Sequence, residues 1–245
     1  MDGTNLYDDE TFFKGYLALR EKSYSANEVE ELPALLSLLP SLTGKTVLDL
    51  GCGCGDTCYR YAAMGARQVV GIDISEKMLQ LAKARKKNES IAFYQMKMED
   101  ISQIKERFDV VTSSLAFHYI QDFSKLIKDI HSLLSNEGVL IFSQEHPLTT
   151  APKKGCTWIY KDSQIQGYQV SDYMEGGERN VEWMNTAVTK YHRNFSEIFH
   201  SLIVNGFEIL EVLEPLAGEE NKAFYPLYEK TLHKPNFLVV KVLKR

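Results

Sequence analysis

The sequence has little cysteine, and its few cysteines are not arranged as a disulfide framework or a zinc site. Three of the four, Cys52, Cys54 and Cys58, lie within one short stretch, and Cys156 is remote from them. Structural zinc sites take four ligands in spaced pairs, whereas these three residues lie in and beside a glycine-rich turn. A metal site and small residues of a tight turn are the two interpretations. We favour the turn, predict no bound metal, and expect reduced thiols in a cytoplasmic protein.

The sequence also lacks an apolar run long enough to cross a membrane, and its first residues do not resemble a signal peptide. It has no basic excess, because 28 Lys and Arg stand against 33 Asp and Glu, giving a formal net charge of −5. Nucleic acid is therefore disfavoured as the main ligand. One local basic run either binds RNA or, as is more usual, matches the dipole at a helix end; it comprises Lys83, Arg85, Lys86 and Lys87.

No internal repeat or low-complexity segment interrupts the chain. At 245 residues it is long enough for one α/β domain with a substantial core and a small insertion. We therefore expect residues 1–245 to form a single domain.

Glycine is concentrated in residues 46–56, which read Thr-Val-Leu-Asp-Leu-Gly-Cys-Gly-Cys-Gly-Asp. The apolar run of residues 46–50 predicts a buried strand, and a helical pattern follows from Asp56 to near Gly65. Between them lie Gly51, Gly53 and Gly55. Glycines let a backbone approach a ligand closely, and the free N–H groups of a helix start point toward it. This pattern therefore predicts a ligand cradle.

The acids around this turn indicate which ligand it binds. Asp49 precedes the glycines and Asp56 follows them. Two carboxylates would repel a pyrophosphate but would favour a ligand that carries an ammonium and a sulfonium. A second predicted strand, residues 68–73, ends in Asp73, about 20 residues past the glycines, where such folds place the carboxylate that binds ribose hydroxyls.

These segments resemble the class I S-adenosylmethionine-dependent methyltransferases, in a form similar to the methyltransferase type 11-like domain. The motifs are Val-Leu-Asp-Leu-Gly-Cys-Gly-Cys-Gly at residues 47–55 and Gly-Ile-Asp-Ile-Ser at residues 71–75. The resemblance covers residues 44–145, whereas residues 1–25 and 146–235 resemble a less characterised subgroup that methylates small molecules. It implies a Rossmann-like α/β fold: a mostly parallel seven-stranded sheet with an antiparallel last strand, helices on both faces and a small cap insertion.

The resemblance also implies that the cofactor is S-adenosyl-L-methionine, and it assigns candidate cofactor-binding residues. They are Asp49, Gly51, Cys52, Gly53, Gly55, Asp73, Ile74, Met78, Met98, Glu99, Ser114, Tyr16 and Arg20.

The adenine contacts depart from the family pattern, because Lys97 stands where many relatives have an aspartate. Met98 is expected to flank the ring. Glu99 or Asp100 either supplies the acceptor for the adenine amino group or caps the following turn.

Further strands are expected at residues 91–95, 108–113, 138–144, 207–213 and 237–243, and a polar loop at residues 214–235. Helical stripes follow Ser75 and Asp122 and occupy residues 28–39 and 195–203. Parallel strands present their carboxyl ends to the ligand. The residues after the fourth and fifth strands are therefore expected at the site, namely residues 114–119 and Glu145-His146-Pro147.

A general base is needed only if the acceptor must lose a proton. His146 and His192 are the first candidates and His118 is the next, although His118 is equally well explained as a packed residue. Candidate acceptor-binding residues are Tyr119, Tyr173, Tyr191 and Arg193. Arg193 either matches an acceptor carboxylate or phosphate or forms an ion pair with an acid such as Glu145.

Two segments flank this core. Residues 1–25 are rich in aromatics and form either a helix packed on the core or a lid over the ligand, in which Arg20 either meets the methionine carboxylate or lies on the surface. Residues 147–193, with Trp158 and Trp183, are too long for a plain connection and are expected to form a cap over the acceptor pocket. A subunit interface and a buttress are the alternatives for this insertion.

The sequence therefore predicts a methyltransferase that acts on a small molecule by in-line displacement at an oxygen, nitrogen or carbon atom. A non-catalytic protein that binds S-adenosylmethionine for regulation is the first alternative. A nicotinamide-dependent oxidoreductase is the second, and Asp49 and the glycine spacing disfavour it.

Overall fold

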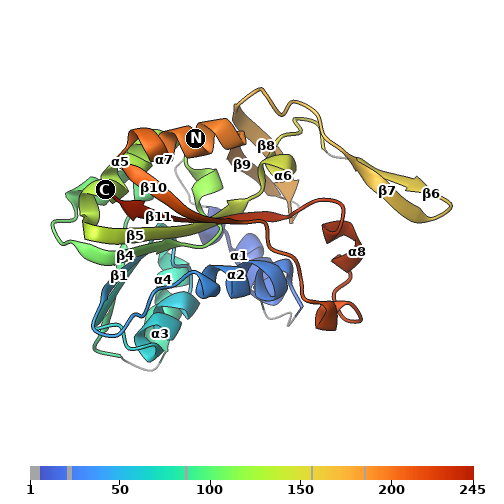
Figure 1. Cartoon of the computed structure of the whole chain (residues 1–245). Coiled ribbons are helices and arrows are strands. Elements are labelled where there is room, and N and C mark those ends of the chain that lie inside the picture. Colours follow the sequence, from blue (N-terminus) through green and yellow to red (C-terminus); the bar gives the residue numbers. More distant parts are fainter. Residues whose placement is uncertain (1–5, 21–23, 86–87, 156, 185) are drawn as a thin grey trace.

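The computed structural model describes residues 6–20, 24–85, 88–155, 157–184 and 186–245 (Figure 1). A seven-stranded sheet with the order β10-β11-β5-β4-β1-β2-β3 forms its centre. Strands β3, β2, β1, β4 and β5 are parallel, and β11 is antiparallel to both β5 and β10. This confirms the predicted fold. The strands are β1 (Thr46–Leu50), β2 (Gln68–Asp73), β3 (Ile91–Gln95), β4 (Phe108–Ser113), β5 (Leu134–Glu145), β10 (Phe207–Leu213) and β11 (Phe237–Lys244).

Strand β1 lies in the middle of the parallel part, because it pairs with β2 on one side and with β4 on the other. All five of its residues are buried, which explains why the segment is continuously apolar apart from Thr46 and Asp49. Strand β5 begins earlier than predicted, at Leu134 rather than at Gly138. The strand begins earlier because Leu134 already pairs with Phe108 of β4, ahead of a register shift, and it continues through Glu137 despite the φ of 58° at that residue.

Helices cover both faces of the sheet, so two apolar clusters form. Val47 belongs to the cluster that contains Leu35 of α2 (Leu32–Ser37) and Tyr61 of α3 (Asp56–Ala63). Its neighbour Leu48 points the other way, into the cluster with α5 (Phe123–Leu133) and α7 (Phe195–Val204). Adjacent residues of one strand therefore fill opposite cores.

Side-chain caps set the helix starts. The Ser75 hydroxyl accepts from the Met78 N–H at the start of α4 (Glu76–Ala84), and the Asp122 carboxylate accepts from the Lys125 N–H at the start of α5. Both caps were predicted and are confirmed. The expected helix at residues 28–39 is instead a π-helical turn, η2 (Asn27–Glu31), followed by α2. The N-terminal segment contains a 3₁₀ turn, η1 (Leu6–Asp8), and α1 (Glu10–Arg20).

Residues 147–193, here called the cap, contain one short helix and two antiparallel hairpins. The elements are α6 (Pro147–Thr150), β6 (Thr157–Lys161), β7 (Gln164–Gln169), β8 (Gly177–Trp183) and β9 (Thr186–His192). The β6–β7 hairpin projects away from the sheet in Figure 1.

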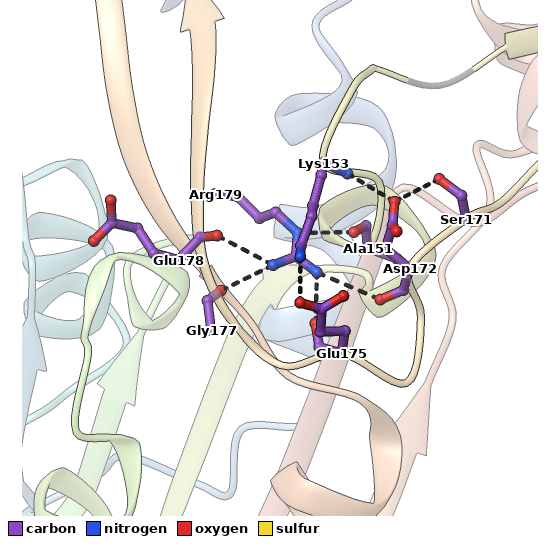
Figure 2. A network of polar contacts seen from close by, with 8 residues as sticks. All are labelled: Ala151, Lys153, Ser171, Asp172, Glu175, Gly177, Glu178 and Arg179. Atoms are coloured by element: carbon purple, nitrogen blue, oxygen red, sulfur yellow. Dashed lines mark hydrogen bonds and ion pairs between the residues drawn. The ribbon is translucent and has the colours of Figure 1, made fainter.

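One buried arginine holds the base of the cap together. The Arg179 guanidinium donates to five backbone carbonyls, those of Ala151, Asp172, Glu175, Gly177 and Glu178, as Figure 2 shows. Its side chain is buried, so these bonds replace the water that its charge has lost. They tie the chain after α6 to strand β8.

Residues 214–235 are not a plain polar loop, and that expectation was wrong. The segment contains η5 (Glu219–Asn221) and α8 (Tyr228–Thr231). Ala217, Tyr225 and Tyr228 are buried together and pack against Ala26 and Val29. This third small cluster anchors the segment beside η2.

Other short elements are η3 (Met98–Gln103) and η4 (Phe117–Tyr119). In the part of the chain that the structure describes, no helix combines the length and the apolar character needed to span a membrane. Lys86, Lys87 and Cys156 lie outside the described residues, as does the side chain of Arg20.

Candidate active site

The carboxyl ends of β1, β2, β4 and β5 meet at one edge of the sheet, and the glycine turn joins them there. The N–H groups of Gly51 and Cys52 both donate to the Ile72 carbonyl, which links the turn to β2. Gly51, Gly53 and Gly55 have φ angles of 72°, 53° and 78°. Only glycine adopts such angles readily, so the spacing of the motif follows from the shape of the turn.

The three glycines differ in what surrounds them. A Cβ atom at Gly51 would lie 2.8 Å from both Ala116 Cβ and Met98 Cε, and one at Gly55 would lie 2.7 Å from Phe93 Cζ. A Cβ atom at Gly53 would meet nothing within 4 Å. Gly51 and Gly55 are therefore packed against protein, whereas Gly53 faces open space, as a ligand cradle requires.

Asp73 closes this space from the β2 side. Its carboxylate accepts from the Gly53 N–H and from the Ser75 N–H, both at 2.8 Å. The side chain is half-buried, and burial raises the pKa of its carboxyl. A carboxylate accepts about four hydrogen bonds, so Asp73 keeps acceptor capacity for a ligand hydroxyl group. The open space at Gly53 and this remaining capacity fit a ribose.

Asp49 is buried beneath the turn and is bonded to protein groups. It accepts from the hydroxyls of Thr57 and Thr112, at 2.5 and 3.0 Å, and from the Cys58 thiol at 3.4 Å. Burial raises the pKa of this carboxyl, although the two hydroxyls lower it. Asp49 thus fixes β1 against β4 and α3.

The cysteines of the turn are free thiols. Cys52 and Cys58 are buried, and Cys52 donates weakly to the Gly53 carbonyl. Within the described ranges, no three His, Cys, Asp or Glu side chains come together in a way that would hold a metal ion.

The remaining cofactor candidates surround this cradle unevenly. Met98 contacts the position above Gly51, Met78 is buried in α4, and Ile74 is 40% exposed. Glu99 and Lys97 are both exposed. Ser114, directly after β4, donates from its hydroxyl to Glu31 at 2.9 Å.

The N-terminal segment docks beside Asp73. The Asp8 carboxylate accepts from the Ser75 hydroxyl at 2.7 Å and from the Lys77 N–H at 3.2 Å. Asp8 therefore adds to the capping of α4, which the sequence did not indicate. The Tyr7 hydroxyl donates to the Tyr119 hydroxyl at 3.4 Å.

An aromatic cluster joins this segment to the cap. The Tyr7 ring packs edge-on against Phe12 and Tyr16, at 5.3 Å in both cases. Trp183 of β8 packs against the same two residues, at 5.3 Å from Phe12 and 6.2 Å from Tyr16. The N-terminal segment and strand β8, which are far apart in the sequence, therefore meet here, and Tyr16 contacts both Tyr7 and Trp183.

Two of the three predicted bases have both ring nitrogens bonded to protein. His146 accepts from the Leu148 N–H at Nδ1 and is 2.8 Å from Glu214 at Nε2. His192 is 2.8 Å from the Thr150 hydroxyl at Nδ1 and 2.9 Å from the Tyr173 carbonyl at Nε2. Burial lowers the pKa of both rings. His146 therefore joins the start of the cap to the chain after β10, whereas His192 ties α6 and Tyr173 to β9 within the cap.

His118 lies closer to the site, on η4. It is buried, and its Nδ1 accepts from the Glu145 N–H at 3.4 Å, which places the proton of the neutral ring on Nε2. Burial lowers the pKa of His118 to about 4, so the ring is neutral at pH 7. Its ring centroid lies 4.3 Å from that of Tyr119. In this tautomer Nε2 donates a hydrogen bond.

Glu145 is paired with Lys190, a residue that the sequence did not single out. The Lys190 ammonium lies 2.5 Å from the Glu145 carboxylate and 5.6 Å from the centroid of the Trp183 ring. Burial alone would raise the pKa of Glu145, but the neighbouring Lys190 ammonium lowers it. Strand β9 buries every second residue, Val188, Lys190 and His192. That alternation was the available signal for Lys190.

Arg193 does not pair with Glu145, so that alternative was wrong. Its guanidinium donates to the backbone carbonyls of Phe117, Ile120, Gln121 and Tyr191, and it packs over the Phe123 ring at 5.0 Å. Burial lowers the pKa of Arg193 to about 10. Arg193 thereby fixes η4, the turn that carries His118 and Tyr119.

The three tyrosines predicted at the acceptor pocket are placed differently from one another. Burial raises the pKa of Tyr119, which faces Tyr7. The Tyr173 hydroxyl accepts from the Phe195 N–H at 3.3 Å, and Tyr191 is half-buried opposite Glu178 in the β8–β9 hairpin. Of these tyrosines, Tyr119 contacts the N-terminal segment, which docks beside Asp73.

A surface cavity of about 540 Å³ lies between α2 and the chain after β10. It is lined by residues such as Val29, Pro33 and Leu216, and none of its lining residues belongs to the cluster described above. The cavity is therefore separate from the candidate active site.

The parallel sheet with its antiparallel β11, the open glycine turn and the carboxylate at the end of β2 together define a class I S-adenosylmethionine-dependent methyltransferase. The comparisons with known proteins agree. The chain belongs to the family described as "Methyltransferase domain", whose family profile matches residues 41–195.

Three relatives illustrate the similarity. An uncharacterized protein of Haemophilus influenzae is 40% identical over 247 residues, covering 98% of this chain and 97% of that protein. The crystal structure of an S-adenosylmethionine dependent methyltransferase from Mesorhizobium loti has a TM-score of 0.82 and 31% identity, covering 92% of this chain and 100% of the other. The demethylmenaquinone methyltransferase of Lactococcus lactis is 33% identical over 127 residues, 49% of this chain and 50% of that enzyme.

The protein is therefore an S-adenosylmethionine-dependent methyltransferase, as predicted, and its cofactor is S-adenosyl-L-methionine. The same comparisons favour this assignment over the nicotinamide-dependent oxidoreductase.

Proposed function

We propose that this enzyme methylates a small-molecule acceptor held between the glycine turn, the N-terminal segment and the cap. The observation that carries the proposal is that Tyr7 packs against both Tyr16 and Tyr119, while Tyr16 packs against Trp183 of the cap. The N-terminal segment, η4 and β8 therefore come together. The ion pair between Lys190 and Glu145 supplies polar groups next to these rings, because the Lys190 ammonium lies over the Trp183 ring. Aromatic and polar side chains gathered beside the cradle suit a small organic acceptor, which the enzyme must align and shield from water.

The bound cofactor supplies a methyl group activated by its sulfonium. We assign the ribose hydroxyls to Asp73 and the close backbone approach to Gly53, with Gly51 shaping the turn and Met98 beside the adenine. Asp49 contributes its negative charge from beneath the turn. The other proposed cofactor-binding residues lie around the glycine turn and the ends of β2 and β3. They are Ile74, Met78, Glu99, Cys52 and Gly55.

On the acceptor side, we assign the orienting roles to His118, Tyr119 and Glu145. The Nε2–H of His118 donates a hydrogen bond, and the Glu145 carboxylate accepts one from an acceptor O–H or N–H. His146 and His192, whose ring nitrogens are bonded within the protein, hold the cap in place rather than accept a substrate proton. Tyr173, Tyr191 and Arg193 support the same region through backbone contacts.

Calorimetry with S-adenosylhomocysteine tests the cofactor assignment. Asp73→Asn replaces one carboxylate oxygen by an amide donor and should weaken this ligand by roughly 10- to 150-fold, which corresponds to about 1.5–3 kcal/mol for bonds to a charged group. Asp109→Asn is the matched control, because Asp109 also accepts two hydrogen bonds, from the N–H and hydroxyl of Thr46 at the opposite end of the strands. Equal affinities in the two variants would refute the ribose assignment.

Methyl transfer from labelled S-adenosylmethionine to a panel of phenols, carboxylates and amines then tests the acceptor. Transfer to any of these supports the proposal. Cofactor binding without transfer to any of them, or to extracted metabolites, would favour a regulatory protein instead. We also infer a cytoplasmic location from the reduced thiols of Cys52 and Cys58, because disulfide-forming compartments favour oxidised cysteines.

A further inference from the structure

The π-helical turn η2 contains two consecutive buried glutamates. Glu30 is 1% exposed and Glu31 is 0% exposed. Burying a carboxylate is unfavourable unless hydrogen bonds replace its water. Single π-helical turns are uncommon in proteins, and those that occur are often found at functional sites. The partners of the two glutamates show what each one holds.

Glu30 holds the C-terminal part of the chain. Its carboxylate accepts from the Tyr225 hydroxyl and, at 3.1 Å, from the Asn236 amide. Burial raises the pKa of this carboxyl. These partners belong to the anchored segment after β10 and to the start of β11, so the contacts of Glu30 lie away from the glycine turn.

Glu31 holds the edge of the sheet at the candidate active site. Its Oε1 accepts from the Ser114 hydroxyl at 2.9 Å and from the Ser143 hydroxyl, and its Oε2 accepts from the Asn27 amide at 2.5 Å. Ser114 directly follows β4, and Ser143 lies in β5. One carboxylate therefore joins the ends of two neighbouring strands.

The residue between these contacts is strained. Leu115 has a φ of 52°, in the left-handed region that a branched side chain rarely adopts. Its N–H donates both to the Ser143 carbonyl at 3.1 Å and to the Ser143 hydroxyl oxygen at 3.0 Å. Since the Ser143 hydroxyl proton is directed to Glu31, its lone pairs are free to accept from Leu115.

This strained turn continues into the site. Ala116 comes next, and its Cβ lies where a side chain at Gly51 would stand. His118 and Tyr119 follow on η4. The conformation of Leu115 therefore decides how this stretch meets the glycine turn. Strained residues of this kind cluster at active sites, where the surrounding structure must hold them.

We propose that Glu31 is a positioning residue for methyl transfer, which holds the Ser114–Ala116 turn in its strained conformation through the Ser114 and Ser143 hydroxyls. The inference rests on the proposed function, because it concerns the same site. Without Glu31 the Ser143 hydroxyl reorients and the turn relaxes. Ala116 then shifts relative to Gly51, and the cofactor cradle loses its shape.

The test compares Glu31→Ala with Glu30→Ala, which removes the adjacent buried carboxylate of the same π-helical turn. The measurements are thermal unfolding, S-adenosylhomocysteine affinity by calorimetry, and hydrogen exchange of residues 113–119. Both variants should lose stability. Only Glu31→Ala should weaken the ligand, by roughly tenfold, and speed the exchange of the Leu115 amide, because only Glu31 supports its acceptor.

Two further variants separate positioning from general destabilisation. Glu31→Gln keeps an oxygen for the two serine hydroxyls and should bind within roughly threefold of the parent protein. Leu115→Gly accepts a positive φ without strain, so adding it to Glu31→Ala should recover most of the lost affinity. If Glu31→Ala does not fold, Ser143→Ala removes the same acceptor and should give the same exchange pattern.

The outcomes are distinguishable. No binding of S-adenosylhomocysteine by the parent protein would overturn the proposed function itself. Binding by the parent with equal losses in Glu30→Ala and Glu31→Ala, or no recovery by Leu115→Gly, would overturn only the role of Glu31.

Discussion

The assignment of Gly53 to the cofactor cradle can be tested sharply. Two glycines of the glycine turn and one glycine outside it all have positive φ angles but have different surroundings. Gly44, Gly51 and Gly53 have φ angles of 74°, 72° and 53°. A Cβ atom would meet nothing within 4 Å at Gly44 and Gly53, but would lie 2.8 Å from Ala116 Cβ and Met98 Cε at Gly51. Gly44 lies in the turn before β1, at the opposite end of the strand from the proposed cradle.

The expected losses of stability follow from these numbers. Alanine in the left-handed region is disfavoured by about 1–2 kcal/mol, and its smaller unfolded-state entropy offsets about 0.4–1 kcal/mol of that. Gly44→Ala and Gly53→Ala should therefore each lose about 1 kcal/mol, seen as a Tm lower by about 2–4 °C. Gly51→Ala should lose about 1–3 kcal/mol more, since Ala116 cannot move without its backbone.

Ligand affinity separates the two open glycines. The methyl group of Gly53→Ala enters the space assigned to the cofactor, so S-adenosylhomocysteine should bind at least about tenfold more weakly, or about 1.4 kcal/mol. Gly44→Ala should bind it as the parent protein does. Calorimetry on both variants is the assay. If Gly53→Ala and Gly44→Ala bind alike, the open space at Gly53 is not the cofactor cradle and the reasoning fails.

Two other predictions concern the groups around the site. The pKa of His118 is about 4 when folded, because of burial, against about 6.5 when unfolded, so the unfolded chain binds the proton first and stability falls as pH drops from about 6.5 to about 4. In urea unfolding, the free energy of unfolding of His118→Gln should fall by about 3 kcal/mol less than that of the parent protein over this pH range. Parallel plots of this free energy against pH would contradict a buried neutral ring. Arg179→Ala leaves five backbone carbonyls without their guanidinium donor and should lower the free energy of unfolding by about 3 kcal/mol. Proteolysis of residues 151–183 should be faster, with little change in S-adenosylhomocysteine affinity. Unchanged proteolysis would show that this guanidinium does not hold the cap.

The sequence predicted the sheet well because each strand carries its own local signal. The runs at residues 46–50, 68–73, 91–95 and 108–113 became β1, β2, β3 and β4 with the expected bounds. The start of β5 was missed because Glu137 and Gly138 look like a turn, and pairing with β4 overrides that local preference. The π-helical form of η2 was missed because its apolar spacing also fits an ordinary helix.

The candidate site was predictable where one stretch of chain builds it. Gly51, Gly53 and Asp73 were predicted to lie together, and the structure brings them to one edge of the sheet, because a left-handed turn needs glycine and parallel strands end at the same edge. The roles of the histidines were not predictable in this way. His146 and His192 look like bases in the sequence, and only their partners Glu214 and Tyr173 show them bonded within the protein.

The sequence by itself determined the fold, the glycine turn and the family, since periodicity and glycine placement act between near neighbours. Tertiary structure alone decided the polar partners, pairing Glu145 with Lys190 across 45 positions and Glu31 with Ser143 across 112. The physical reason is that a buried charge takes whichever donor the packing brings within reach. That choice depends on how β5, β9 and η2 come together, and no local pattern records it.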